Sequence, residues 1–187
     1  MKKILLSIII IFSIIISLAQ ESRHPTSTLI QGNFVLGGKV THKTMVYRSG
    51  INLDFAVLKR IKPQLQVGAG SGVVILEDEI FIPFYAIIKT NFKEILPSYY
   101  LTFKIGYSYG NNYKVNSYTY YNYSGGLIIE PGFGYQFQLT ETTKFNAGIK
   151  AISQLGILNY KSDVYPEDLY KERLRFLLVG LNFGFEF

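Results

Sequence analysis

The sequence predicts an all-β protein, an eight-stranded antiparallel up-and-down transmembrane β-barrel preceded by a cleavable signal peptide. Three observations lead to this fold class. Apolar and polar residues alternate with period two in eight segments, as in strands whose two faces meet different surroundings. The apolar face runs for five or six positions in nearly every segment. The opposite face combines glycines with charged residues at mid-strand positions, which suits the interior of a barrel whose outer wall meets lipid.

The alternation is clearest at the end of the chain, RFLLVGLNFGFEF (175–187). Apolar residues from Leu177 to Phe187 share one face there, whereas glycines, an asparagine and Glu186 occupy the other. A strand of 10–11 residues rises about 3.3 Å per residue, so at a tilt near 40° it covers the ~25 Å of an outer-membrane span. The eight predicted strands are residues 29–41, 47–57, 64–75, 80–92, 99–109, 127–139, 145–157 and 175–187.

Charged residues on the glycine-rich faces are predicted to point into the lumen. An exported soluble carrier of the lipocalin kind is the alternative, and it would place the apolar face inside. The predicted luminal charge network is Lys39, Arg48, Asp54, Lys89, Lys104, Glu130, Lys150 and Glu186. Aromatic residues favour the membrane barrel because they end the apolar faces, where such barrels carry aromatic girdles. These residues are Tyr47, Phe92, Tyr99, Tyr107, Tyr109, Tyr135, Phe145 and Phe187.

The connections fit a barrel with both ends on the periplasmic side. Residues 58–63, 93–97 and 140–143 are short and are predicted to form periplasmic turns. The two long connections, 110–124 and 158–171, fall on the outer side and are predicted to be loops.

The N-terminal 19 residues have the pattern of a secretory signal peptide. Lys2 and Lys3 precede an apolar run from Ile4 to Leu18, which is shorter than the roughly 20 residues of a membrane-spanning helix. We expect cleavage after Ala19, a periplasmic stub over residues 20–28 and a barrel domain over 29–187. An uncleaved anchor is the alternative.

Composition restricts the function classes. The chain has no cysteine, which excludes disulfides and thiolate metal sites. Its net charge is +6, but the basic residues are scattered, with no evident basic helix or patch. Contact with anionic lipid headgroups is therefore favoured over nucleic acid.

Several motifs resemble the small eight-stranded bacterial outer-membrane barrels of the OmpX- and OmpW-like group. They are GINLDF (50–55), PQLQVGAGSGV (63–73), FIPFYA (81–86), PSYYLTFKIGYSYG (97–110), EPGFGYQF (130–137) and VGLNFGFEF (179–187). The resemblance implies a location in the bacterial outer membrane, among outer-membrane lipid and lipopolysaccharide. It also implies folding by the outer-membrane assembly machinery, which recognises a final aromatic residue such as Phe187. It implies no specific activity.

The predicted function is a structural or surface-contact role through the outer loops. An eight-stranded barrel has an interior wide enough only for side chains, so the luminal charges indicate a paired plug rather than an ion path. The outer connection 111–124 is rich in tyrosine and asparagine, which suits contact with an extracellular protein or glycan. The interpretation favoured over such contact is a β-hairpin extension above the membrane, whose tyrosines meet the lipopolysaccharide headgroups. The candidate contact residues are Tyr113, Tyr118, Tyr120, Tyr121 and Tyr123.

Catalytic, metal and cofactor sites are not predicted. The chain has two histidines, His24 and His42; a lipid-modifying hydrolase using His42, with Ser49 or Ser71 nearby, is the alternative function. No nucleophile and base have the spacing of such a site. The acidic residues of 161–173, which are Asp163, Glu167, Asp168 and Glu172, and those of 77–79 are interpreted as solvated loops rather than cation sites. Gly68, Gly70 and Gly72 are interpreted as space for large luminal neighbours rather than a phosphate loop.

Overall fold

The computed structural model describes residues 26–41, 44–77, 79–92, 98–116, 119–162 and 165–187, without the side chains of residues 41, 111–121 and 160–169. The predicted signal peptide (1–19) and residues 20–25 of the predicted stub lie outside this part of the chain. Within the described residues, no helix is long and apolar enough to cross a membrane.

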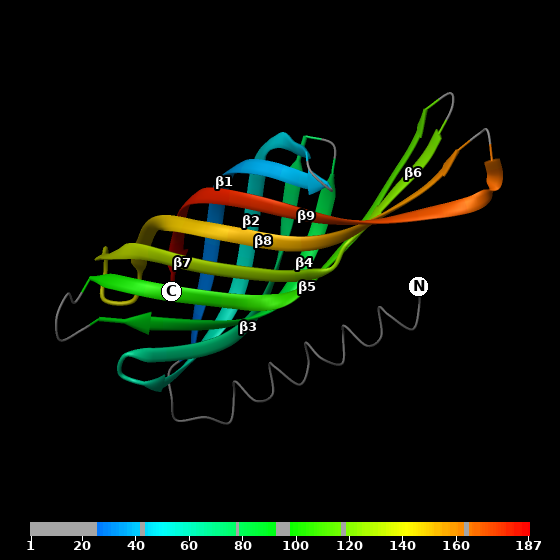
Figure 1. The fold of residues 1–187 in the computed structure, drawn as a ribbon. Helices are drawn as coiled ribbons and strands as arrows, with labels where there is room; N and C mark the ends of the chain where they lie inside the picture. The colour runs from blue at the N-terminus through cyan, green and yellow to red at the C-terminus, as the bar shows by residue number, and fades with distance from the viewer. Residues whose placement is uncertain (1–25, 42–43, 78, 93–97, 117–118, 163–164) are drawn as a thin grey trace.

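The described residues form a closed antiparallel β-barrel (Figure 1). Consecutive strands pair from β1 to β6 and from β7 to β9, and β9 pairs with β1 to close the wall. β6 and β7 follow one another in the same wall position, so the predicted eight-stranded up-and-down barrel is confirmed. The strands are β1 (Thr26–Thr41), β2 (Thr44–Lys62), β3 (Leu65–Leu76), β4 (Ile80–Asn91), β5 (Tyr99–Asn116), β6 (Thr119–Ser124), β7 (Leu127–Gln138), β8 (Lys144–Ser162) and β9 (Tyr165–Glu186).

The two long connections are mostly strand, so their prediction as loops is wrong. β5 continues to Asn116 and pairs with β6, and β8 and β9 stay paired as far as Ser162 and Tyr165. β6 also pairs with β8. The segments 111–116, 119–124, 157–162 and 165–173 therefore form a four-stranded sheet, here called the outer sheet, which projects beyond the barrel (Figure 1). Pairing satisfies backbone groups that a long loop would leave to water. The β-hairpin interpretation of 111–124 is confirmed for its strand pairing, while contact of its tyrosines with lipopolysaccharide headgroups stays a prediction.

The two faces of the wall are assigned as predicted. Phe183 and Phe185 are 52% and 43% exposed on the outside, whereas Glu186 is 2% exposed inside. Along β4 every residue from Ile80 to Lys89 alternates between exposed and buried. An apolar outer wall around a charged interior is the arrangement of a barrel in lipid and excludes the soluble carrier, whose cavity would be apolar.

Aromatic rings form an arc on the outer wall near the chain terminus. Consecutive rings lie 4.6–6.3 Å apart, centroid to centroid, from β5 across β7 and β8 to β9. Phe187 ends this arc, and its backbone exchanges two hydrogen bonds with Thr28 of β1 at 2.9 and 3.0 Å. The rings are those of Tyr99, Phe133, Tyr135, Phe137, Phe145, Phe185 and Phe187. The last residue thus belongs to both the girdle and the closing seam.

Part of the interior is apolar, which the sequence reasoning missed. A cluster here called the apolar plug lies on the inward faces toward the outer end of the barrel. Its rings, Phe81 and Phe176, meet edge to face at 5.3 Å. The plug consists of Val35, Val74, Leu76, Phe81, Ile128, Ile152, Phe176 and Leu178. The lumen is therefore filled by packing as well as by charge.

Inward-facing glycines give large side chains the space they need. A Cβ on Gly70 would lie 2.8 Å from the Tyr85 ring, and one on Gly72 would lie 2.7 Å from the Asp54 carboxylate. A Cβ on Gly134 would lie 2.5 Å from the Tyr100 ring and 2.6 Å from a backbone oxygen of β8. The interpretation of Gly70 and Gly72 as space for neighbours is confirmed. It is wrong for Gly68, where the three atoms nearest to an added Cβ are backbone atoms of β2.

We expect Gly134→Ala to destabilise the barrel by about 1–3 kcal/mol, because Tyr100 is buried and overpacking displaces it. The lipid-facing Gly32 has no atom within 4 Å of an added Cβ, so Gly32→Ala is the matched control. Urea unfolding of barrels refolded into lipid vesicles measures both. Equal midpoints for the two variants would contradict the packing described for Gly134.

Candidate functional site

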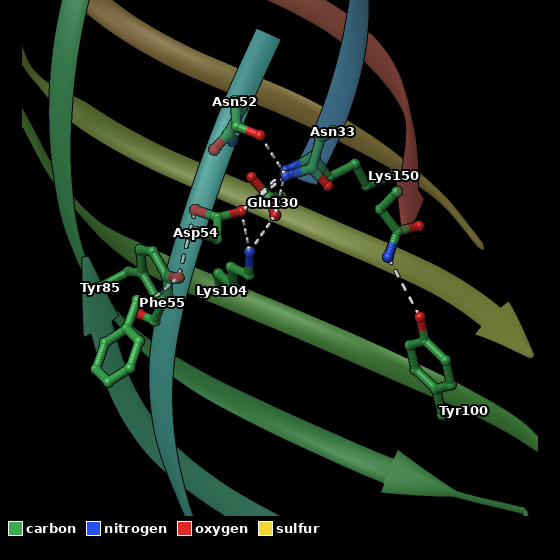
Figure 2. A network of polar contacts seen from close by, with 10 residues as sticks. Asn33, Asn52, Asp54, Phe55, Tyr85, Tyr100, Lys104, Glu130 and Lys150 are labelled. Atoms are coloured by element: carbon green, nitrogen blue, oxygen red, sulfur yellow. Dashed lines mark hydrogen bonds and ion pairs between the residues drawn. The ribbon is translucent and has the colours of Figure 1, made fainter. Parts of the chain in front are cut away.

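Four charged side chains meet in the middle of the lumen and are here called the ion ring (Figure 2). Lys104 Nζ lies 2.8 Å from Asp54 Oδ2 and 2.7 Å from Glu130 Oε1. Lys150 Nζ lies 3.3 Å and 3.1 Å from the same two oxygens. Each lysine therefore bridges both carboxylates, and the ring connects β2, β5, β7 and β8.

The ion ring is neutral and supported by uncharged partners. Two lysines balance two carboxylates, and all four residues are at most 5% exposed. Asn33 Nδ2 donates to Asp54 Oδ2 at 3.2 Å, and the Tyr85 hydroxyl donates to Asp54 Oδ1 at 3.3 Å. The Lys104 ammonium also lies 4.8 Å from the centre of the Tyr85 ring. Burial of these ions is tolerated because each has opposite charge and hydrogen bonds in place of water.

A second charged cluster lies nearer the chain terminus, around Glu186. The buried carboxylate pairs with Lys89 and accepts hydrogen bonds from Gln66 at 2.8 Å and Ser27 at 3.1 Å. Lys89 Nζ also donates to Asn146 at 3.1 Å. This periplasmic cluster connects β1, β3, β4, β8 and β9.

A third cluster lies at the outer end of the lumen. Glu79 is fully buried and lies 3.5 Å from Lys39 Nζ and 3.3 Å from Arg48 Nε. Arg48 also lies 3.5 Å from the more exposed Glu77. Lys39 donates to the Tyr123 hydroxyl at 3.1 Å and lies over its ring. The interpretation of 77–79 as a solvated loop is therefore wrong for Glu79; Asp78 lies outside the described residues.

All eight predicted luminal charges are inside the barrel, but they form three clusters rather than one network. Asp54, Lys104, Glu130 and Lys150 form the ion ring, Lys89 and Glu186 the periplasmic cluster, and Lys39 and Arg48 the outer cluster. Glu79 was missed, although a signal existed. Extending the β4 alternation back by one step from Phe81 places residue 79 on the inward face.

The other candidate residues are only partly described. Tyr118, His24 and His42 lie outside the described residues, as do the side chains of Tyr113, Tyr120 and Tyr121. Tyr123 contacts Lys39 at the barrel mouth. Ser49 donates to Glu77 at 3.2 Å. Among the side chains that are described, no group of three or more His, Asp or Glu could hold a metal ion.

No family model matches the chain, and no curated protein matches it. Solved structures do. The outer membrane protein OprG from Pseudomonas aeruginosa is 12% identical with a TM-score of 0.54, and the match covers 90% of this chain and 98% of OprG. The outer membrane protein AlkL is 10% identical with a TM-score of 0.55, covering 87% of this chain and 89% of AlkL.

The chain has the fold of the small eight-stranded outer-membrane β-barrels. Its apolar outer wall and filled, charged lumen belong with that fold. Together they place the barrel in the bacterial outer membrane. The outer sheet lies beyond the rim opposite the chain terminus, and the periplasmic side of that terminus stays a prediction.

Removing one carboxylate from the ion ring leaves a buried ammonium without a full partner. We expect Glu130→Ala and Asp54→Ala each to cost about 3–5 kcal/mol of unfolding free energy. Glu141→Ala, in the exposed turn between β7 and β8, should leave the urea midpoint in detergent unchanged. Equal midpoints for Glu130→Ala and Glu141→Ala would refute a stabilising role of the ring.

The ring's neutrality gives a sharper test. Glu130→Gln leaves a buried excess positive charge, whereas Glu130→Gln combined with Lys150→Met removes one ion of each sign. Because paired removal costs far less than single removal, we expect the double variant to regain part of the stability that Glu130→Gln loses. Additive losses in a double-mutant cycle would show that the two residues are not coupled.

Proposed function

We propose that the protein is a closed outer-membrane barrel whose outer sheet makes contact with an extracellular protein or glycan. The observation that carries this proposal is the combination of a filled lumen with a projecting sheet. The barrel itself then serves as an anchor, and the contact surface lies beyond the membrane.

The filled lumen supports closure to bulk diffusion. Along β1, a solute would meet the level of Asn33 and the ion ring, then Val35 in the apolar plug, then Lys39 in the outer cluster. Each layer draws on several strands, so a path would require ions to separate and side chains to repack together. An eight-stranded wall leaves no width beyond those side chains.

The shape and composition of the outer sheet support a contact role. Its residues 111–124 include Tyr and Asn in abundance, and tyrosine offers a large amphipathic area for a small loss of conformational entropy. Beyond the Val40–Arg175 pair, β9 is no longer paired with β1, so the sheet stands clear of the wall on that side. The Lys39–Tyr123 contact fixes its base to the barrel mouth.

Closure predicts the electrical behaviour of the purified barrel. In planar lipid bilayers we expect no stable conductance steps above the leak, since the lumen lacks a continuous aqueous path. Long-lived ohmic steps from protein that migrates as folded barrel on an unheated gel would contradict closure.

The contact role predicts a loss of binding when the sheet is shortened. Replacing residues 112–123 by Asn-Gly joins Asn111 to Ser124, which are already paired, through a two-residue hairpin. Nanodisc-embedded wild type and variant are compared on a glycan array and by adhesion of cells that display them. We expect glycans or surfaces that retain the wild type and release the variant.

Heat-modifiable migration on a gel confirms that the shortened barrel is folded. Identical glycan retention and adhesion for the two folded proteins would overturn the contact role while leaving closure intact.

A further inference from the structure

Three basic side chains form a column on the outward face of β9. Lys171, Arg173 and Arg175 occupy alternate positions and are all exposed. Glu172 and Leu174 lie between them in sequence, but the alternation of a strand turns these two residues to the other face. Because these two residues separate the cations along the chain, the segment KERLR (171–175) was not predicted to be a basic patch.

The column begins where the lipid-facing band of the same strand ends. From Phe187 to Leu177 the outward positions are apolar over ten residue steps, about 33 Å of strand and about 25 Å of membrane thickness at the usual tilt. Arg175 is the next outward residue. At the same rise and tilt, Arg175, Arg173 and Lys171 lie about 5, 10 and 15 Å beyond Leu177. Arg175 is therefore at the depth of the outer-leaflet headgroups, and the other two cations extend outward from it.

The neighbouring strand presents apolar side chains beside the column. Leu155 is opposite Arg175 and Ile157 is opposite Arg173 in the β8–β9 register. These two residues are 40% and 41% exposed. A cationic column next to an apolar one suits an amphiphile, with acidic headgroup atoms on β9 and hydrocarbon on β8, better than a soluble anion.

Among the described side chains, these cations have no counter-charge. None of the three takes part in an ion pair or hydrogen bond with another side chain of the described chain, in contrast to the luminal lysines. Beyond Val40, β1 no longer flanks β9, so this side of the column is open. Unpaired cations at a membrane surface attract anionic lipid.

We infer that Lys171, Arg173 and Arg175 bind the phosphate groups of an outer-leaflet glycolipid of the lipid A type, with its acyl chains against Leu155 and Ile157. Arginine binds phosphate through two parallel N–H donors, and the column offers successive sites about 7 Å apart along the strand. The lipid would hold the base of the outer sheet at the membrane surface. This site includes the base of the outer sheet, at Lys171, Arg173 and Ile157, and does not involve the tyrosine-rich residues 111–124.

The test uses the full mature chain in phosphatidylcholine nanodiscs, titrated with lipid A carrying two phosphates or with dephosphorylated lipid A. We expect the wild type to prefer the phosphorylated form. Each cation near an anionic surface contributes about fivefold in affinity, so Lys171→Gln, Arg173→Gln and Arg175→Gln together should weaken binding by on the order of 100-fold. Backbone NMR shifts of β8 and β9 locate the bound lipid.

Lys59→Gln, Arg60→Gln and Lys62→Gln, at the β2–β3 turn on the periplasmic rim, remove the same net charge and serve as control. An equal loss of affinity in this control would reduce the effect to net charge and overturn the site. Equal binding of the two lipid A forms, or unchanged affinity in the folded β9 variant, would overturn it as well. Preserved phosphate preference in the control with loss only in the β9 variant is the supporting result.

Discussion

The structure depends on the requirement that a chain in lipid keep its charges inside and paired. A wall of eight strands leaves a lumen too narrow for bulk water, so an unpaired lysine there would be costly. The ion ring meets this requirement with two lysines and two carboxylates, each ion touching both of its opposites at 2.7–3.3 Å. Because its members come from β2, β5, β7 and β8, the pairing is complete only when opposite walls of the barrel are in place.

The rest of the lumen is also filled by side chains along the barrel axis. Charged clusters at both ends and an apolar plug between the ion ring and the outer cluster fill the lumen in layers. Glycines such as Gly134 leave room for buried rings. At the outer end the Lys39–Tyr123 hydrogen bond joins this interior to the outer sheet. The sheet is thus a continuation of the barrel wall, anchored by a residue pair at the barrel mouth.

The sequence predicted the wall well and the contacts within it poorly. Period-two alternation identifies a strand and its two faces, so the positions of Phe183, Asp54 and Lys104 followed directly. Alternation does not identify which inward residues are in contact, because the stagger between strands sets their relative heights. The single predicted charge network is therefore three separate clusters in the structure. The plug was missed because an inward apolar residue such as Phe81 lies between outward apolar residues, so the sequence shows no change of polarity that marks its face. In the outer sheet, tyrosines and asparagines occur at both odd and even positions, so period-two alternation is absent. In β9, Glu172 and Leu174 separate the three basic residues, so the sequence does not show them as a column.

The central claim is that the lysines and carboxylates of the ion ring are in direct contact across the lumen. Solid-state NMR of uniformly labelled protein in lipid bilayers measures this through dipolar couplings between lysine Nζ and carboxyl carbons. N–O separations of 2.7–3.3 Å place Lys104 Nζ within about 4 Å of both the Asp54 and the Glu130 carboxyl carbons. Couplings of that strength from Lys104 and Lys150 to both acids are the predicted result. Lysine Nζ atoms that couple to water alone, with no carboxyl carbon in reach, would contradict the account.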